Sequence, residues 1–133
     1  NRIDFVELQK EFKDFMLKNI DDFIAGTQTN ILTTGVLEVN FPQQYDLVLA
    51  NPPYYLDGHG RISDHPKKNT CHFMDKQNFE AFMTLAKNSL KADGIFYFTG
   101  RKEHELLKQY LHQGLIKEEL SLNKSSIFTL VHD

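Results

Sequence analysis

The stretch Asp46-Leu47-Val48-Leu49-Ala50-Asn51-Pro52-Pro53-Tyr54-Tyr55 joins an apolar run to a rigid polar tip. The run from Leu47 to Ala50 is too short for a helix, and it lies between an acid and two prolines, so it predicts a short buried strand. A proline disfavours the helical conformation in the residue before it, so Asn51 should leave the strand extended. The tip then lies at the carboxyl end of a strand, where open α/β sheets bind ligands.

The tip is rich in hydrogen-bond acceptors. Neither Pro52 nor Pro53 has an N–H, whereas the Asn51 side-chain oxygen and the Pro52 carbonyl can both accept. Tyr54 adds an aromatic face on which a planar ring can stack. Two acceptors beside a stacking face suit an amine on a planar group, such as adenine N6, cytosine N4 or a glutamine amide. The tetrapeptide Asn51-Pro52-Pro53-Tyr54 also fits a simple stiff turn, and its residues alone leave both interpretations open.

Strands and helices are predicted to alternate on both sides of this stretch. Helices are indicated by apolar residues at intervals of three and four, and strands by short β-type runs. The expected strands are Ile3-Val6, Ile31-Leu32 with an exit loop through Val36-Leu37, and residues 95–99, 116–122 and 127–131. The expected helices span residues 8–24 and 101–112. A further helix between them is capped by Asp75 or Asn78 and ends at Ala92-Asp93-Gly94. This order predicts an α/β layered sheet, mostly parallel, with an antiparallel hairpin at its end.

The composition fits one domain with a single core. The chain has 133 residues, of which 41% are hydrophobic, and it contains no apolar run near the roughly 20 residues of a membrane helix and no signal peptide. We therefore expect a soluble protein that does not bind membranes. A single cysteine, Cys71, excludes an internal disulfide and favours the cytoplasm. The net charge of −3 provides no general attraction to nucleic acid, so any such binding must come from local clusters.

The stretch Asp46-Leu47-Val48-Leu49-Ala50 followed by Asn51-Pro52-Pro53-Tyr54 resembles the amine-methylating motif of class I S-adenosylmethionine-dependent methyltransferases. The doubled tyrosine, the loop with His and Lys and the helix and strand after it are most similar to the bacterial tRNA1(Val) adenine-N6 methyltransferase family. This similarity extends from Ile3 to Val131. It implies a Rossmann-like fold, S-adenosylmethionine as cofactor, and adenine N6 in RNA, first of all tRNA, as the methylated group.

The resemblance also implies roles for individual residues. The catalytic residues would be Asn51, Pro52, Pro53 and Tyr54, with Asn51 also touching the cofactor. Glu7 matches the acid that binds the cofactor ribose, although an acid at this position can equally complement the dipole of the following helix.

Residues that would contact the substrate lie at the tip and in the loop after it. They are Tyr54, Tyr55, Lys67, Lys68 and His72, with the two lysines available to phosphates. A solvated loop without function explains residues 56–70 equally well. His59, His65, Cys71 and His72 match no common zinc-ligand spacing, so no metal is expected.

The resemblance implies a first strand and a glycine-rich turn that these residues do not contain. We therefore interpret residues 1–133 as a partial methyltransferase domain, truncated at the N-terminus, that runs from about the second strand to the C-terminal hairpin. Unpaired strand edges and weak or no binding of S-adenosylmethionine by these residues alone are expected. The alternatives are methylation of another amine, on DNA adenine, cytosine N4 or a protein glutamine, and a non-catalytic remnant. The sequence does not indicate the oligomeric state.

Overall fold

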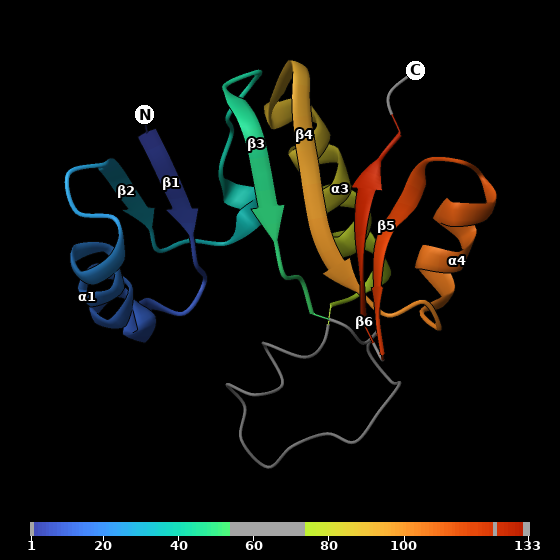
Figure 1. Ribbon diagram of the computed structural model, residues 1–133, viewed down its shortest axis with the longest axis horizontal. Coiled ribbons are helices and arrows are strands. Elements are labelled where there is room, and N and C mark those ends of the chain that lie inside the picture. Colours follow the sequence, from blue (N-terminus) through green and yellow to red (C-terminus); the bar gives the residue numbers. More distant parts are fainter. Residues whose placement is uncertain (1, 54–73, 124, 132–133) are drawn as a thin grey trace. The chain divides into compact units, whose positions relative to one another are not determined.

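The computed structural model describes residues 2–53, 74–123 and 125–131. Its chain divides into two compact units, Asn1–Asn40 and Phe41–Asp133. Figure 1 shows the strands and helices of each unit. No helix within these described ranges is long and apolar enough to cross a membrane.

The first unit is a strand, helix, strand motif. Strand β1 (Arg2–Val6) pairs in parallel with β2 (Gln28–Leu32), and Phe5 lies opposite Ile31. A 3-10 helix (Lys10–Phe12) and α1 (Lys13–Phe23) connect them. The two predicted strands are confirmed, and the exit from β2 forms a second 3-10 helix, Val36–Glu38.

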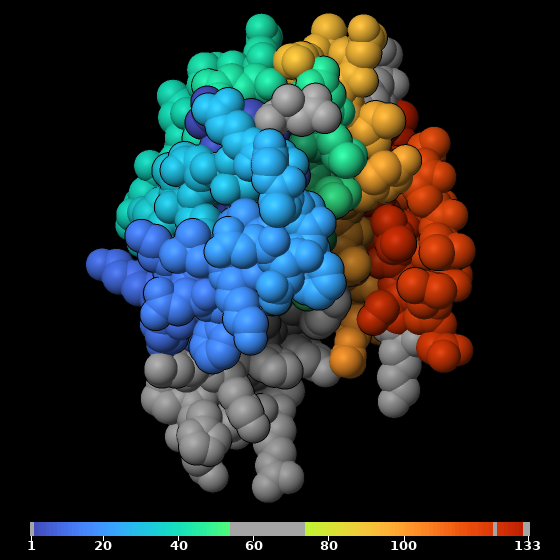
Figure 2. Space-filling view, turned by 60° about the vertical axis from the view of Figure 1, so that its left-hand side comes forward, coloured from blue at the N-terminus to red at the C-terminus, as the bar shows by residue number. Residues whose placement is uncertain are grey.

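Helix α1 is shorter and more exposed than predicted. It begins at Lys13 rather than near Leu8, and Ile20 is its one buried residue. Phe15 and Phe23 are 69% and 81% exposed, and they belong to the unit that is blue in Figure 2. Much of the apolar face that the sequence spacing indicates is therefore exposed in the described part of the chain, where the sheet of this unit has two strands.

The second unit contains a four-stranded sheet in the order β3-β4-β6-β5. Strand β3 (Tyr45–Ala50) is parallel to β4 (Leu90–Gly100), whereas β6 (Ser125–Leu130) is antiparallel to both β4 and β5 (Ile116–Leu122). The predicted antiparallel hairpin at the sheet edge is therefore confirmed. In the described part of the chain β1 and β3 each have a strand neighbour on one side.

Two helices accompany this sheet. Helix α3 (Lys76–Ser89) is capped by Asp75, whose Oδ1 accepts from the Asn78 backbone N–H at 2.6 Å. Its predicted apolar face is confirmed, since Phe79, Phe82, Met83 and Ala86 are buried. Helix α4 (Glu105–His112) begins four residues later than expected and buries Leu106 and Leu107. The core also contains three stacked rings from β4 and β6, Phe96, Phe98 and Phe128.

The predicted end of α3 at Ala92-Asp93-Gly94 is wrong. The helix ends at Ser89, and β4 starts at Leu90. Tyr45 pairs with Leu90 but Leu47 pairs with Ile95, so β4 contains extra residues relative to β3 at this point. The irregular pairing lets the chain enter the sheet before it reaches Gly94.

Strand β3 is half-buried on one face and exposed on the other, which corrects the prediction of a buried strand. Leu47 and Leu49 are 50% and 69% exposed, whereas Val48 and Ala50 are half-buried. Successive side chains of a strand point to opposite faces, and among the described elements of this unit α3 packs on one face of β3 and β4. The other face therefore keeps its leucines exposed.

Candidate active site

Asn51, Pro52 and Pro53 follow the last residue of β3. The parallel register pairs Ala50 with Phe98, so the next residue on each strand, Asn51 and Thr99, lie side by side. The Thr99 hydroxyl donates a hydrogen bond to Asn51 Oδ1. Asn51 is exposed, and Pro52 directly after it is buried. The predicted acceptor tip therefore lies at the carboxyl end of a parallel strand pair, with its amide held by the neighbouring strand.

The tip presents different groups on the two faces of the sheet. Phe96 and Phe98 are buried, whereas Tyr97 and Thr99 between and after them are half-buried. This alternation places Thr99 on the face opposite the aromatic core, and the Asn51 carboxamide lies on that face because it contacts Thr99. Pro52 packs on the core side.

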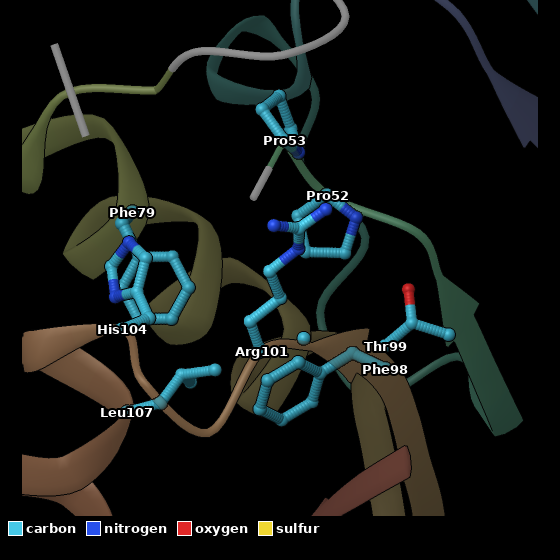
Figure 3. Close-up of a pocket in the computed structure, with 9 residues that line it drawn as sticks. Pro52, Pro53, Phe79, Phe98, Thr99, Arg101, His104 and Leu107 are labelled. Carbon is cyan, nitrogen blue, oxygen red and sulfur yellow. The ribbon is translucent and has the colours of Figure 1, made fainter. Parts of the chain in front are cut away.

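A small pocket lies on the core side of the tip (Figure 3). Its lining residues come from the tip, α3, the end of β4 and α4: Pro52, Pro53, Phe79, Phe98, Thr99, Gly100, Arg101, His104 and Leu107. The rings of Phe79 and His104 lie with centroids 5.9 Å apart and an interplanar angle of 33°. The pocket combines apolar walls with the side chains of Arg101 and His104, and its interior is small.

Thr99, Arg101 and His104 are site residues that the sequence analysis did not identify. Thr99 ends the run of residues 95–99, which was correctly predicted as a strand, and Arg101 and His104 follow it. The available signal was positional: when two strands are parallel, the residues after both of them reach the same edge of the sheet. That rule singles out residues 51–54 after the first strand and, by the same argument, the residues that end and follow the second strand.

Glu7 lies in the other unit, directly after β1. Its backbone N–H donates to the Leu32 carbonyl at 3.0 Å, which extends the β1 and β2 pairing by one residue. Its carboxylate Oε1 accepts from the Gln9 backbone N–H at 2.8 Å, just before the 3-10 helix Lys10–Phe12. Glu7 thus has a local structural role, and a carboxylate has further acceptor positions for ribose hydroxyls. Its role in cofactor binding stays a prediction.

The other predicted site residues lie outside the described residues. These are Tyr54, Tyr55, Lys67, Lys68 and His72, together with His59, His65 and Cys71 of the rejected zinc pattern. Among residues 2–53, 74–123 and 125–131 there is no group of three or more His, Cys, Asp or Glu side chains that could hold a metal ion.

The amino end of β3 carries an ion pair at the opposite end of the strand from Asn51. Both carboxylate oxygens of Asp46 lie 2.8 Å from Lys91 Nζ on β4. The hydrogen bond and charge of the Lys91 ammonium hold the pKa of the Asp46 carboxyl below its ordinary value of 3.8. This pair links the two strands that carry the candidate site.

The parallel strands, the helices and the polar tip at their carboxyl end define a Rossmann-like α/β protein. No protein-family model matches the chain, and no curated protein matches its sequence. Solved structures do share its fold. One is a Haemophilus influenzae protein assigned as a methylase (18% identity, TM-score 0.56), a second is an Escherichia coli protein assigned as a methyltransferase (13%, 0.56), and a third is an S-adenosylmethionine-dependent methyltransferase from Leishmania major (14%, 0.56).

Each of these matches covers 98% of the chain, which spans 73%, 63% and 55% of the three neighbours respectively. The chain therefore shares the Rossmann-like α/β fold of these three proteins, and it corresponds to between about half and three quarters of their length. The predicted α/β fold class is confirmed. At these identities the likeness concerns the fold.

Proposed function

We propose that the protein is an S-adenosylmethionine-dependent N-methyltransferase that methylates the N6 amine of adenine in RNA, with tRNA as the first substrate to test. The observation that carries this proposal is the position of Asn51. Its carboxamide is exposed at the carboxyl end of β3, it contacts the neighbouring parallel strand, and it is followed by two prolines. The fold shared with methyltransferases supports the methyl-transfer part of this proposal.

The chemistry needs two acceptors and a flat amine. The target adenine would leave its base stack and lie on Tyr54, while Asn51 Oδ1 and the Pro52 carbonyl accept the two amine hydrogens. These hydrogen bonds orient the nitrogen lone pair toward the reacting carbon. As the bond from nitrogen to the methyl carbon forms, the sulfur–methyl bond of the donor would break and leave a neutral thioether. The nitrogen would carry a positive charge, which the two oxygens would stabilise until a proton leaves to solvent.

S-adenosylmethionine would supply a methyl group that is already activated by its sulfonium. The Glu7 carboxylate has the acceptor chemistry to hold the ribose hydroxyls of this cofactor. Since the donor is activated, the protein itself contributes alignment and electrostatic stabilisation. Asn51 would contribute most to both.

Replacing Asn51 by alanine tests the proposal. The protein as expressed from its own gene would be incubated with labelled S-adenosylmethionine and with separate tRNA, DNA and protein fractions. We expect label in tRNA with the wild type and a loss of at least about 100-fold with Asn51→Ala, the size seen when a donor or acceptor to the reacting group is removed. Asn88→Ala, on the exposed side of α3, is the matched control and should keep full activity.

The same incubation separates the alternatives. Label in DNA or protein, lost with Asn51→Ala, would retain the amine chemistry and replace the substrate. Near-normal transfer by Asn51→Ala would contradict the mechanism. Absence of transfer to all three fractions would favour the non-catalytic alternative.

A further inference from the structure

We propose that Glu118 is a positioning residue: it holds the turn between β4 and α4, and through this turn it places Arg101 and His104 beside the tip. The catalytic consequence of this inference rests on the proposed function. In the turn, Lys102 Nζ lies 2.8 Å from Glu118 Oε1 on β5. The contact reaches across the sheet, because β6 lies between β4 and β5.

The Glu118 carboxylate joins three elements. Besides Lys102, the hydroxyls of Ser126 on β6 and Ser121 on β5 donate hydrogen bonds to it. Ser126 is 2% exposed and pairs with Gly100, the last residue of β4 before the turn. The Lys102 ammonium and the Ser126 hydroxyl hold the pKa of the Glu118 carboxyl below its ordinary value of 4.5, so the group is charged at neutral pH. The serines therefore fix the carboxylate in the sheet, and Lys102 reaches it from the turn.

The turn carries two residues of the pocket. It runs from Arg101 to His104, whose backbone N–H donates to the Arg101 carbonyl at 3.0 Å. Both residues line the pocket together with Pro52 and Pro53 of the tip (Figure 3). Lys102 lies between them in the sequence, so a contact that fixes Lys102 also limits where they can lie. Loss of this contact would therefore move the surroundings of the tip.

The next residue, Glu119, provides a contrast on the same strand. Its Oε1 lies 2.8 Å from Lys117 Nζ, and this ion pair stays within β5. Exposed pairs of this kind contribute little to stability. Glu118 and Glu119 thus have the same charge and ion pairs of the same length, but the pair of Glu118 reaches the turn beside the tip.

The consequence for the reaction is an effect on its rate. The Pro52 carbonyl is one of the two acceptors proposed for the target amine, and small misplacements of aligned groups slow a reaction. The contact can be broken from either side, by removing the carboxylate charge or the ammonium. A positioning role predicts the same result from both changes, although they alter the charge of the protein in opposite directions.

Two substitutions and one control test the inference. Glu118→Gln keeps the shape of the side chain and removes its charge, whereas Lys102→Met removes the ammonium. The protein as expressed from its own gene would be assayed for methyl transfer to tRNA. We expect both variants to lower kcat about 3- to 10-fold, with unchanged KM for S-adenosylmethionine. The double variant should be no slower than the slower single variant, because both changes break one contact. Glu119→Gln is the matched control and should keep full activity.

Two kinetic results would overturn the inference. One is an unchanged kcat with opposite changes in the KM for tRNA, because Glu118 and Lys102 would then act on the RNA through their charges alone. The other is an equal loss of kcat in Glu119→Gln and Glu118→Gln, because the contact with the turn would then have no effect of its own.

A second measurement does not depend on turnover. The His104 ring centroid lies 5.9 Å from that of Phe79, so the NMR signals of this ring respond to small movements of the turn. These signals, identified by their loss in His104→Gln, should shift in Glu118→Gln and stay in place in Glu119→Gln. Unchanged signals in Glu118→Gln would overturn the inference. Shifted signals in a protein without methyl transfer would retain the positioning of the turn and contradict the proposed function, so the two failures are distinguishable.

Discussion

Gly94 is the residue whose missing side chain most directly affects the strand that carries Asn51. A Cβ at this position would lie 2.8 Å from the Tyr45 carbonyl oxygen and 3.0 Å from Leu90 Cδ2. The first of these is a backbone atom in the irregular β3 and β4 pairing, and it cannot rotate away. The close approach of two chains, rather than an unusual backbone angle, explains a glycine here.

Gly94→Ala should therefore destabilise the fold. We expect the free energy of unfolding to fall by about 1–3 kcal/mol, the usual range for overpacking in a tight site. Urea denaturation would measure this loss. Gly35→Ala is the control, because its nearest neighbour would be a Glu38 side-chain oxygen at 3.5 Å and its φ is −64°. Equal stability of the two variants would contradict the proposed clash.

At the scale of single residues, the sequence predicted the tip at Asn51 but not the residue that donates a hydrogen bond to it. The apolar run that ends at Ala50 and the prolines after Asn51 together place Asn51 at the end of a strand, and the structure confirms this. Thr99 could not be identified as its hydrogen-bond donor, because the contact depends on the register between two strands that residues 51–89 separate in the sequence. Local rules describe the residue before a proline, whereas strand pairing is set by the whole fold.

At the element scale, β3 and β4 form the parallel pair that supports the site, and Asp46 and Lys91 join them at the end opposite Asn51. The pKa of Asp46 in the folded protein lies below its ordinary value of 3.8 because of the Lys91 ammonium. The ion pair therefore stabilises the folded protein at pH values above 3.8. This stabilisation is lost as the pH falls through 3.8 toward the lowered pKa of Asp46.

Asp46→Asn should accordingly lower the melting temperature slightly at pH 7, and the difference should shrink as the pH falls below 3.8. The effect is small because both side chains are largely exposed to solvent. Thermal unfolding of both proteins between pH 7 and pH 2 would measure it. In a Lys91→Met background the effect of Asp46→Asn at pH 7 should vanish. A difference that grows toward low pH would contradict the assigned sign.

Element boundaries show where sequence patterns stop being informative. Asp75 and the spacing of Phe79, Phe82 and Met83 were sufficient to predict α3 and its buried face. Its end at Ser89 was not predictable, because the chain leaves the helix to pair Leu90 with Tyr45 on another strand. The exposure of Leu47 and Leu49 was missed for a similar reason, since an apolar run does not indicate how many of its faces are covered.

At the scale of the whole molecule, the buried apolar side chains are distributed unevenly between the two units. In the described ranges Ile20 is the one buried hydrophobic residue of the first unit, whereas the second unit contains the stacked core of Phe96, Phe98 and Phe128. Burial of apolar area is the main source of stability. The prediction of one partial methyltransferase domain did not distinguish the two units by how many apolar side chains they bury, because both have similar alternating patterns of apolar residues.

Hydrogen exchange should reveal this difference. Local opening is easier where few apolar contacts are lost, so the backbone amides of β1 and β2 should exchange at least about tenfold faster than those of β4 and β6, after correction for intrinsic rates. Exchange measured by NMR at one pH and temperature would test it, with the amides of the edge strand β5 as an internal comparison within the second unit. Equal protection of β1 and β4 would mean that the first unit is stabilised by contacts other than its own buried side chains. A ligand that binds at the Glu7 carboxylate should slow the exchange of backbone amide hydrogens in β1, because binding to the folded form adds to the free energy of opening.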